Sequence, residues 1–453
     1  MRQIPVVSSD EGINAVIRTE SARFGSDFSP VFFREVEPVL EFIKYELPDL
    51  KILNFSDKAV DCLRILKEIQ DDPWLHYGSI IAVHDDGADK AVLENIRDAN
   101  IVSVLSRGDF IRNLGRLLRV IRQNKQILFQ RGFQQHLLKS ISGELIMDND
   151  PLDITTYANL ITNYLYNANL IGKDEKENLH VTLLELLINA VEHGNCRIGF
   201  EEKSAWLESG GDIMELIRKK NLDPAIKARK VKVEYTIEPD RSAFVIEDEG
   251  AGFDWRARFE KKANEPGLHG MGIGMARHFV QDLAYSDRGN RVSFSIEHRK
   301  AETNTMPRIF ASAEAIQAQN GQYICQEGEE SDYLFYIVSG TFNVYSRGKL
   351  VSALTPDDIF LGEMSFLLSN RRSATVVAKG PASLVKISKQ DFVNMIKNNP
   401  HYGIFLARLL AQRLARLNVR TVRLNAEYQK LKNEKAGPVV DPAQPKHGDT
   451  GPT

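Results

Sequence analysis

The hydrophobic pattern of this chain changes character along its length, and no single fold satisfies all of its parts. Up to about residue 125, short β-rich runs alternate with helical patterns, whereas after residue 309 short strands are separated by Gly and Asp turns. A period of 3.6 residues buries one face of a helix and a period of 2 buries one face of a strand, so a change of period marks a change of architecture. The chain of 453 residues is also too long for one core, and we expect three domains.

Polar stretches without periodicity indicate the boundaries between these domains. We expect an α/β domain at 1–125, a second folded domain at 133–300, and a β-roll with C-terminal helices at 303–420. The last segment, 421–453, begins as a helical extension and ends in a tail rich in Pro and Gly, a composition typical of disorder. The fold class is therefore multidomain, with α/β and β domains.

Composition limits the partners and the compartment. Lys and Arg total 58 against 61 for Asp and Glu, and the net charge of −3 gives no broad attraction to nucleic acid or anionic lipid. Cys62, Cys196 and Cys325 lie far apart, which argues against a disulfide framework or a zinc site and predicts reduced core thiols. The first residues lack an apolar signal core, and no window holds 18 apolar residues in a row. We therefore predict a cytoplasmic protein without a membrane segment.

The N-terminal rhythm of strands and helices indicates a parallel sheet with covering helices. This stretch resembles a response-regulator receiver domain, in which PDLKILNFSD corresponds to the strand that carries the phosphorylated aspartate. Asn54 stands at that position, and the lysine that the family places after the last strand corresponds to Ser106 or Arg107. A carboxylate is needed to accept the phosphoryl group, so the resemblance implies a degenerate receiver. Its last helix is expected within 109–131, where apolar residues recur at helical spacing among many cations.

The central segment HVTLLELLINAVEHGN, 180–195, has helical spacing, with Glu185 and Asn189 four residues apart on one face. An Asn carbonyl can bind Mg²⁺, and a carboxylate can accept a proton from an attacking hydroxyl. One helical turn therefore supplies both groups that a metal-bound triphosphate needs. Taken alone, the pair would equally suit an exposed helix face.

Two glycine-rich elements follow this helix. VIEDEGAGFD, 245–254, reads as a buried strand that ends in Asp248 and leads into a tight loop with Gly250 and Gly252. GLHGMGIGMARHFV, 267–280, places three glycines just before an amphipathic helix, whose free amides suit a phosphate. These glycines are Gly270, Gly272 and Gly274. Either cluster alone would also fit an ordinary loop.

In this order, the three elements resemble the ATPase domain shared by histidine kinases, DNA gyrase and heat-shock protein 90. Within it, NAVEHG and DEGAGFD are most like the small serine kinases that act as anti-sigma factors. The resemblance covers roughly 140–298, apart from an insertion at 197–228, and implies an α/β sandwich that binds ATP and Mg²⁺. It implies that Glu185 is the general base and Asn189 the Mg²⁺ ligand. The remaining nucleotide-binding positions that it implies are His193, Asp248 at the adenine amino group, Gly250, Gly252, and the lid glycines Gly270, Gly272 and Gly274.

The segment EGEESDYLFYIVSG and the run FLGEMSFLLSNRRSATV, 360–376, resemble the cyclic-nucleotide-binding domain and its phosphate-binding cassette. An Arg fork binds two oxygens of a cyclic phosphate better than Lys does, and Arg372 fits this role by register, although Arg371 stands beside it. Glu363 would accept the ribose hydroxyl proton. The cassette residues implied are Gly362, Glu363, Met364, Ser365, Arg372, Ser373 and Ala374. Ser373 leaves cAMP and cGMP open, with cAMP preferred. A plain loop salt bridge between Glu363 and Arg372 is the alternative.

Beyond the roll, apolar residues recur at alternating steps of four and three, which is a short heptad seam and a possible homodimer contact through 410–431. A single helix packed on its own domain would give the same pattern. The seam consists of Leu410, Leu414, Leu417, Thr421, Leu424, Tyr428 and Leu431.

These motifs together predict a cyclic-nucleotide-regulated serine/threonine kinase of anti-sigma-factor type. Its protein partner would be an anti-sigma-factor antagonist or a sigma factor. The first alternative is a non-catalytic scaffold that binds ATP and cyclic nucleotide to control partner docking. The second is a phosphorelay histidine kinase, which would need His136 as phosphoacceptor. No proline follows His136 in the expected pattern, and a strand or surface position suits it better.

Overall fold

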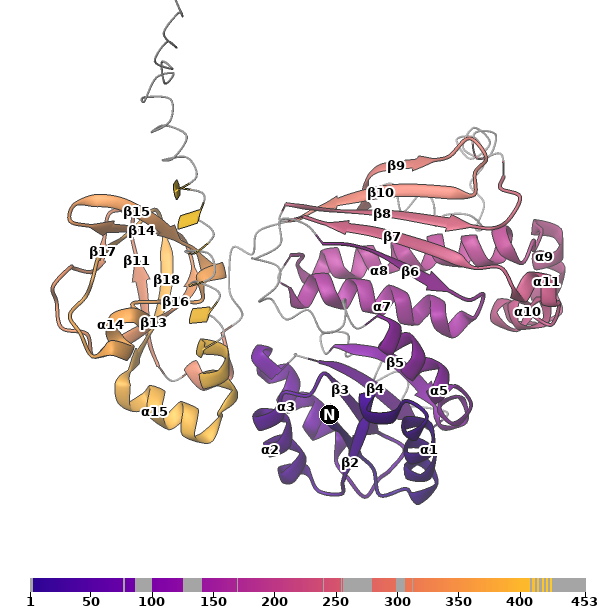
Figure 1. Cartoon of the computed structure of the whole chain (residues 1–453), viewed down its shortest axis with the longest axis horizontal. Coiled ribbons are helices and arrows are strands. Elements are labelled where there is room, and N and C mark those ends of the chain that lie inside the picture. Colours follow the sequence, from indigo (N-terminus) through magenta and orange to yellow (C-terminus); the bar gives the residue numbers. More distant parts are fainter. Residues whose placement is uncertain are drawn as a thin grey trace, which may run out of the picture.

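The structure is a computed structural model with four sheets among the residues that it describes (Figure 1). One five-stranded sheet lies in the N-terminal region, a second lies in the central region, and two four-stranded sheets form the C-terminal roll. The predicted combination of α/β and β domains is confirmed. The described residues are 3–75, 78–85, 100–124, 141–168, 170–238, 240–253, 255, 279–298, 306–311, 313–407 and scattered positions from 410 to 425.

The N-terminal sheet is parallel, as predicted, with the order β2-β1-β3-β4-β5. This is the flavodoxin-like order of a doubly wound domain. Every residue of β3 and β4 is buried, because helices cover both faces of such a sheet. The elements are β1 (Gln3–Val7), α1 (Glu11–Ala22), β2 (Ser29–Phe33), α2 (Val36–Glu46), β3 (Leu50–Asn54), α3 (Cys62–Asp71), β4 (Ser79–His84), β5 (Ile101–Ser106) and α5 (Arg107–Gln123).

Asn54 ends β3 and is fully buried. Its side-chain amide donates to the Ser8 hydroxyl at 3.1 Å, and its carbonyl accepts from the Ser56 hydroxyl at 2.6 Å. Ser106 caps α5, and Arg107 pairs with Asp10 of the β1–α1 turn. Among the described residues no group of three or more His, Cys, Asp or Glu side chains could hold a metal. The hydrogen bonds of Asn54 and the ion pair of Arg107 join the segments that follow β1 and β3 and the start of α5.

The central sheet is antiparallel, with the order β6-β7-β8-β10-β9, and α7 and α8 cover one of its faces (Figure 1). Buried and half-buried residues alternate along β7, as expected for a sheet with one covered face. The helix α8 continues into a π-helical segment, Ala190–Asn195. The elements are β6 (Ile141–Met147), α7 (Pro151–Asn167), α8 (Lys173–Asn189), α9 (Phe200–Glu208), α10 (Ile213–Lys220), α11 (Pro224–Lys227), β7 (Val231–Ile237), β8 (Arg241–Asp248), β9 (Gln281–Tyr285) and β10 (Arg291–Glu297).

The insertion at 197–228 folds into the three short helices α9, α10 and α11. Leu216 and Ile217 of α10 are buried in the central apolar core. The Asn221 side chain donates to the backbone carbonyl of Asn149, just before α7. The insertion is thus an integral part of the central region.

Two antiparallel sheets, β11-β18-β13-β16 and β12-β17-β14-β15, form the C-terminal roll, and the predicted β-roll is confirmed. The elements are β11 (Glu314–Ala318), β12 (Tyr323–Cys325), β13 (Tyr333–Ser339), β14 (Phe342–Ser346), β15 (Lys349–Leu354), β16 (Phe360–Leu361), α14 (Glu363–Leu368), β17 (Thr375–Ala378), β18 (Ala382–Ser388) and α15 (Lys389–Asn398).

Four positions of the proposed heptad seam lie among the described residues, and all four are helical. Leu414 is 61% exposed and Leu424 is 54% exposed, while Leu410 packs in part against the roll. Dimerisation through this seam stays a prediction. Leu417, Tyr428 and Leu431 lie outside the described residues, as does His136.

The N-terminal and central regions share one continuous apolar core. Asn159 and Asn163 of α7 each donate a side-chain hydrogen bond of 3.0 Å to backbone carbonyls of the edge strand β5. Arg116 of α5 donates to Asp150 at 2.7 Å and to Asp153 at 2.9 Å, and Asp153 is only 4% exposed. These contacts fix α7 against the N-terminal sheet.

Replacing Arg116 by Met should destabilise the protein by roughly 3 kcal/mol, because the change leaves the buried carboxylate of Asp153 without its cation. Chemical denaturation measures the effect. Arg119→Met, on the exposed face of the same helix, is the control and should change the unfolding free energy by less than about 0.5 kcal/mol. Equal effects of the two substitutions would contradict this account.

Candidate nucleotide sites

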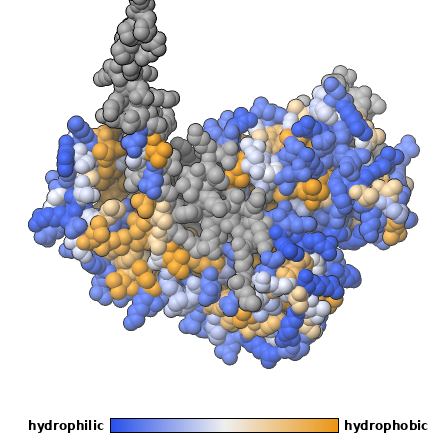
Figure 2. Space-filling view, viewed as in Figure 1, coloured by the Kyte–Doolittle hydropathy of each residue, from blue (hydrophilic) through white to orange (hydrophobic). Residues whose placement is uncertain are grey.

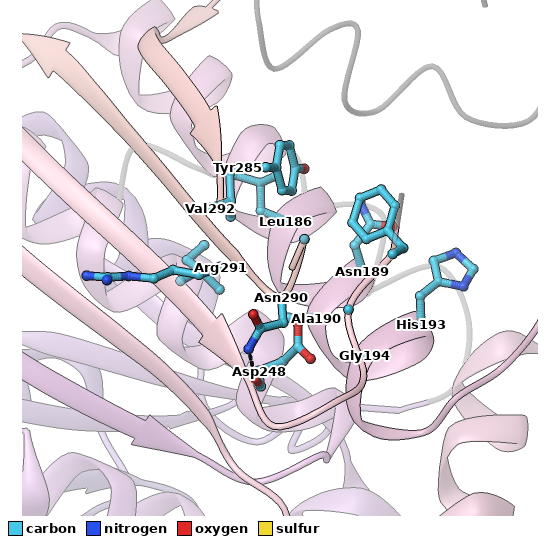
Figure 3. A pocket seen from close by; sticks show the side chains of 14 residues that line it. Leu186, Asn189, Ala190, His193, Gly194, Asp248, Tyr285, Asn290, Arg291 and Val292 are labelled. Atoms are coloured by element: carbon cyan, nitrogen blue, oxygen red, sulfur yellow. Dashed lines mark hydrogen bonds between the residues drawn. The ribbon is translucent and has the colours of Figure 1, made fainter. Parts of the chain in front are cut away.

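The central region contains a cleft between the end of α8, the end of β8 and the start of β10 (Figure 3). It holds about 510 Å³ of empty space, its open mouth included. Side chains from separate parts of the sequence meet there. The lining residues are Leu186, Asn189, Ala190, His193, Gly194, Ile246, Asp248, Gly252, Phe253, Tyr285, Gly289, Asn290, Arg291 and Val292.

Asp248 ends β8 and is 8% exposed. Its carboxyl group lies against Gly194, where an added Cβ would overlap the carboxyl atoms. One carboxyl oxygen accepts the Gly250 backbone N–H at 2.8 Å. Burial raises the pKa of Asp248 from its ordinary value of 3.8 to about 6. At neutral pH the group is mainly a carboxylate, which can accept a hydrogen bond from a ligand in the cleft.

Gly250 and Gly252 form a loop that has no space for larger residues. A Cβ on Gly250 would overlap the Gly194 carbonyl, and one on Gly252 would overlap the Arg288 carbonyl. Gly252 also has φ +82°, which glycine adopts readily. The Arg288 guanidinium donates to the Gly250 carbonyl at 2.9 Å and closes the loop. Both glycines are therefore required by the shape of the cleft wall.

Asn189 and His193 line the cleft from the end of α8 and its π-helical continuation (Figure 3). His193 Nδ1 lies 2.8 Å from the Ile198 carbonyl oxygen, so this nitrogen carries the proton. Glu185 lies one turn before Asn189, is half-buried, and is not among the residues that line the cleft. Gly270, Gly272 and Gly274 lie outside the described residues. Of the predicted ATP-site residues, the cleft thus brings together Asn189, His193, Asp248 and Gly252.

Sequence reasoning missed the contribution of the β9–β10 hairpin. The Asn290 side chain donates to the Asp248 backbone carbonyl at 2.9 Å (Figure 3), and Tyr285 contacts the Phe253 ring edge-on, with ring centroids 5.5 Å apart. The Gly289 turn, with φ +78°, is a recognisable hairpin signal. Its position beside Asp248 depends on strand register, which places Arg291 opposite Glu247.

The insertion reaches the wall of this cleft through an ion pair. Glu192, next to His193, has a fully buried side chain, and Lys203 of α9 contacts its carboxylate at 2.8 Å. His193 Nε2 lies 3.2 Å from the other carboxylate oxygen. The insertion therefore supports the backbone segment that carries His193.

The second site lies in the roll, between β16 and β17. Arg372 is 3% exposed, and its guanidinium donates to the Gly362 carbonyl at 3.0 Å, the Ser365 hydroxyl at 3.2 Å and the Tyr333 carbonyl at 2.6 Å. Its Nε has no partner among the described residues. Gly362 has φ +82°, and a Cβ there would overlap the guanidinium. Within the described part of the chain, the buried Arg372 guanidinium thus has an unpaired Nε–H, and its other hydrogen bonds go to neutral acceptors that an anion can replace.

The neighbouring cassette residues divide between interior and surface. Arg371 is exposed and donates to the Gly328 carbonyl at 2.9 Å, so Arg372 is the inward-facing arginine. Glu363 and Ser365 are each 4% exposed, whereas Met364 is 56% exposed. Figure 2 shows apolar side chains gathered on the part of the roll that carries α14 and α15. Ser373 is exposed and Ala374 half-buried.

Asp248→Asn should stabilise the protein more at neutral than at acidic pH. Because the folded-state pKa of Asp248 is raised, the wild-type carboxyl costs stability as the pH rises through the interval between 3.8 and about 6. The advantage of the amide should therefore grow by about 1.4 kcal/mol between about pH 5 and about pH 7.5. Chemical denaturation of the wild type and the variant at the two pH values measures this, and an advantage independent of pH would contradict it.

Two protein-family models match parts of the chain. The cyclic nucleotide-binding domain matches residues 315–399, and the histidine kinase-like ATPase domain matches residues 221–296. The chain thus joins a histidine kinase-like ATPase domain to a cyclic nucleotide-binding domain, as predicted. The first match contains the whole cassette. The second contains Asp248, whereas Glu185 and Asn189 precede it.

The chain is similar over part of its length to two curated proteins. It is 29% identical over 162 residues to the Pycsar effector protein XpPycTIR of Xanthomonas perforans, which covers 34% of this chain and 53% of that protein. It is 30% identical over 152 residues to the cGMP-dependent protein kinase of Eimeria tenella, which covers 33% of this chain and 15% of the kinase. The chain therefore spans about half the length of the first relative and a smaller part of the second.

Among solved structures, the Thermus thermophilus catabolite activator protein matches 26% of this chain and 57% of its own, with 25% identity and a TM-score of 0.24. In the part of the chain that the structure describes, every helix is too short or too polar to cross a bilayer.

Proposed function

We propose that this protein is an ATP-dependent serine/threonine protein kinase of anti-sigma-factor type whose activity depends on a cyclic nucleotide. The observation that carries the proposal is the meeting of Asn189 and Asp248 in one cleft, although they come from a helix and a strand 59 residues apart. The Asn189 side-chain oxygen can bind the metal ion that accompanies the phosphates. The buried Asp248 carboxylate can accept a hydrogen bond from the base at the other end of the nucleotide.

In this proposal the adenine amino group donates to the Asp248 carboxylate, beside the loop of Gly250 and Gly252. Mg²⁺ commonly takes only one or two protein oxygens and completes its shell with phosphates and water. The Asn189 amide supplies one such oxygen at the cleft, so the residues present fit the ion. Bound there, Mg²⁺ would neutralise phosphate charge. Glu185 would take the proton of the substrate hydroxyl, and Gly270, Gly272 and Gly274 would cover the phosphates.

In the roll, the equatorial oxygens of a cyclic phosphate would take Arg372 donors, and Glu363 would accept the ribose hydroxyl. Gly362, Ser365 and Ala374 would supply backbone amides around the anion. The matching relative from Eimeria tenella is named for cGMP. We keep cAMP as the first candidate and cGMP as the second.

The remaining parts of the proposal concern the whole protein. The N-terminal region would be a degenerate receiver domain within 1–125, followed by the ATPase domain at 133–300 and the cyclic nucleotide domain at 303–420. The substrate would be an anti-sigma-factor antagonist or a sigma factor in the cytoplasm, and two copies of the chain would form a homodimer through 410–431.

A non-catalytic scaffold is the second candidate, and the position of Glu185 favours it. Because Glu185 stands outside the residues that line the cleft, ATP could be held without a base in reach of its γ-phosphate. In that case ATP and cyclic nucleotide would only control partner docking.

Arg372→Lys should weaken cyclic nucleotide binding by about tenfold to one hundredfold, because an ammonium group cannot replace the two-pronged guanidinium. Calorimetric titration of the full chain with cAMP and with cGMP measures the affinity. Arg371→Lys is the matched control and should change it by less than about twofold, since that side chain is exposed. A larger loss in the control would assign the phosphate to Arg371.

Glu185→Gln should reduce phosphotransfer by about one hundredfold or more while leaving ATP affinity unchanged, because only the proton acceptor is lost. Asn189→Ala should weaken Mg-ATP binding itself. The assay follows labelled phosphate from ATP to candidate anti-sigma-factor antagonists, with and without cyclic nucleotide.

Glu177→Gln, two turns earlier on α8, is the control for the phosphotransfer assay and should be fully active. ATP binding without transfer by the wild type would support the scaffold. Acid-labile phosphate on the protein, lost in His136→Gln, would support a histidine kinase.

A further inference from the structure

A tryptophan of the N-terminal region is buried in the core of the C-terminal roll. Trp74 lies in the short turn Pro73–Leu75, between α3 and β4, and is 8% exposed. The apolar cluster that contains it is otherwise made of residues from the roll and the helical segment after it. Its ring neighbours, by centroid distance, are Tyr402 at 4.5 Å, Phe405 at 5.2 Å, Phe360 at 5.8 Å, Phe310 at 6.3 Å and Tyr336 at 6.4 Å.

A carboxylate two residues earlier strengthens this contact. One oxygen of Asp72 accepts from His401 Nε2 at 2.8 Å and from the Tyr402 hydroxyl at 3.0 Å. The His401 side chain is fully buried. Ile404, one turn further, packs in return against the apolar core of the N-terminal region. Figure 1 shows the end of the roll that carries α15 beside α2 and α3. We call Asp72 and Trp74 the interdomain plug.

The plug rests on the two strands that hold the phosphate-site arginine. The strands β13 and β16 are paired, with Tyr336 opposite Phe360, and both rings contact Trp74. Arg372 donates to the carbonyl of Tyr333, which begins β13, and to that of Gly362, which follows β16. Two of the five ring partners of Trp74, Tyr336 and Phe360, therefore lie two or three residues along the chain from backbone acceptors of Arg372.

An anion at Arg372 would compete with the Gly362 and Tyr333 carbonyls for the guanidinium N–H groups. Binding of an anion would then change the hydrogen bonds that hold the start of β13 and the residue after β16. A ligand shifts a conformational equilibrium only through a difference of affinity between two states. Those strand ends are where the difference would arise, and the plug packs directly behind them.

We propose that the interdomain plug couples the cyclic nucleotide site to the N-terminal region, because the hydrogen bonds of Arg372 and the packing of Trp74 meet at β13 and β16. This inference rests on the proposed binding of cyclic nucleotide at Arg372. From the N-terminal region the shared core and the α7–β5 contacts lead on to the ATPase domain. Coupling is reciprocal, so removal of the plug must change the affinity of the roll for its ligand.

The test is titration of the full chain with cAMP and with cGMP. Trp74→Ala and Asp72→Ala should each change the affinity for the cognate nucleotide by about fivefold or more and in the same direction, which is the lower end of typical coupling. Leu63→Ala, 50% exposed on the neighbouring helix α3, is the control and should bind as the wild type does.

A fluorescence measurement on the intact plug accompanies the titration. In a chain with Trp206→Phe and Trp255→Phe, Trp74 is the single tryptophan of the three in the sequence. Its emission should shift when the nucleotide binds, because the Tyr336 and Phe360 rings that it contacts lie on the strands whose hydrogen bonds to Arg372 would change. If circular dichroism shows that Trp74→Ala does not fold, the fluorescence measurement and the Asp72→Ala titration test the coupling instead.

The outcomes separate the two proposals. If the wild type binds neither nucleotide, the proposed cyclic nucleotide site and the proposed coupling are both wrong. A second outcome is equal affinity of the wild type, the two plug variants and the control, with no change in Trp74 emission. In that case the proposed coupling is wrong and the proposed nucleotide site is retained. Opposite changes of affinity in the two plug variants would also overturn the coupling, because both variants remove the same contact.

Discussion

The close approach of a charged side chain to a glycine is the constraint on which both candidate sites depend. In the central cleft, the Asp248 carboxyl lies against Gly194, so the end of β8 meets the π-helical continuation of α8 without a side chain from Gly194 between them. That contact makes Asn189 and Asp248 face one cavity. In the cassette, the Arg372 guanidinium lies against Gly362 in the same way. In each site any larger residue would push apart two elements that must touch.

The two buried charges are stabilised by different means, which suits them to different ligands. Asp248 is an acceptor in an apolar setting, and burial raises its pKa to about 6. Arg372 is a donor whose hydrogen bonds are accepted by two backbone carbonyls and a hydroxyl. A neutral base that donates a hydrogen bond fits the first site. An anion, which can replace neutral acceptors around a guanidinium, fits the second.

The sequence predicted the elements whose signals are local. Strands ending at Asn54 and Asp248, the helix carrying Asn189, and the roll with its glycine turns were all evident from periodicity and turn chemistry. The cleft contributions of Asn290 and Tyr285 were not, because they depend on strand register within the antiparallel sheet. The insertion was recognised as a stretch of sequence, but its ion pair with buried Glu192 joins positions on separate helices, which spacing alone does not indicate.

Contacts between domains are the hardest to predict, and here they decide how the two sites can communicate. Trp74 sits in the stretch DDPWLHYG, whose composition only suggests a turn, and its ring partners lie more than 230 residues further along the chain. A buried tryptophan of this size removes a large apolar area from water and is costly to withdraw, so the plug holds the roll in one position. The Asp72 carboxylate also fixes the orientation of the segment after the roll, because His401 and Tyr402 must both face it to donate their hydrogen bonds. The connection from the roll to the N-terminal region therefore packs against the same strands where Arg372 finds its backbone acceptors, and in a close-packed core a change in those hydrogen bonds would be felt at Trp74.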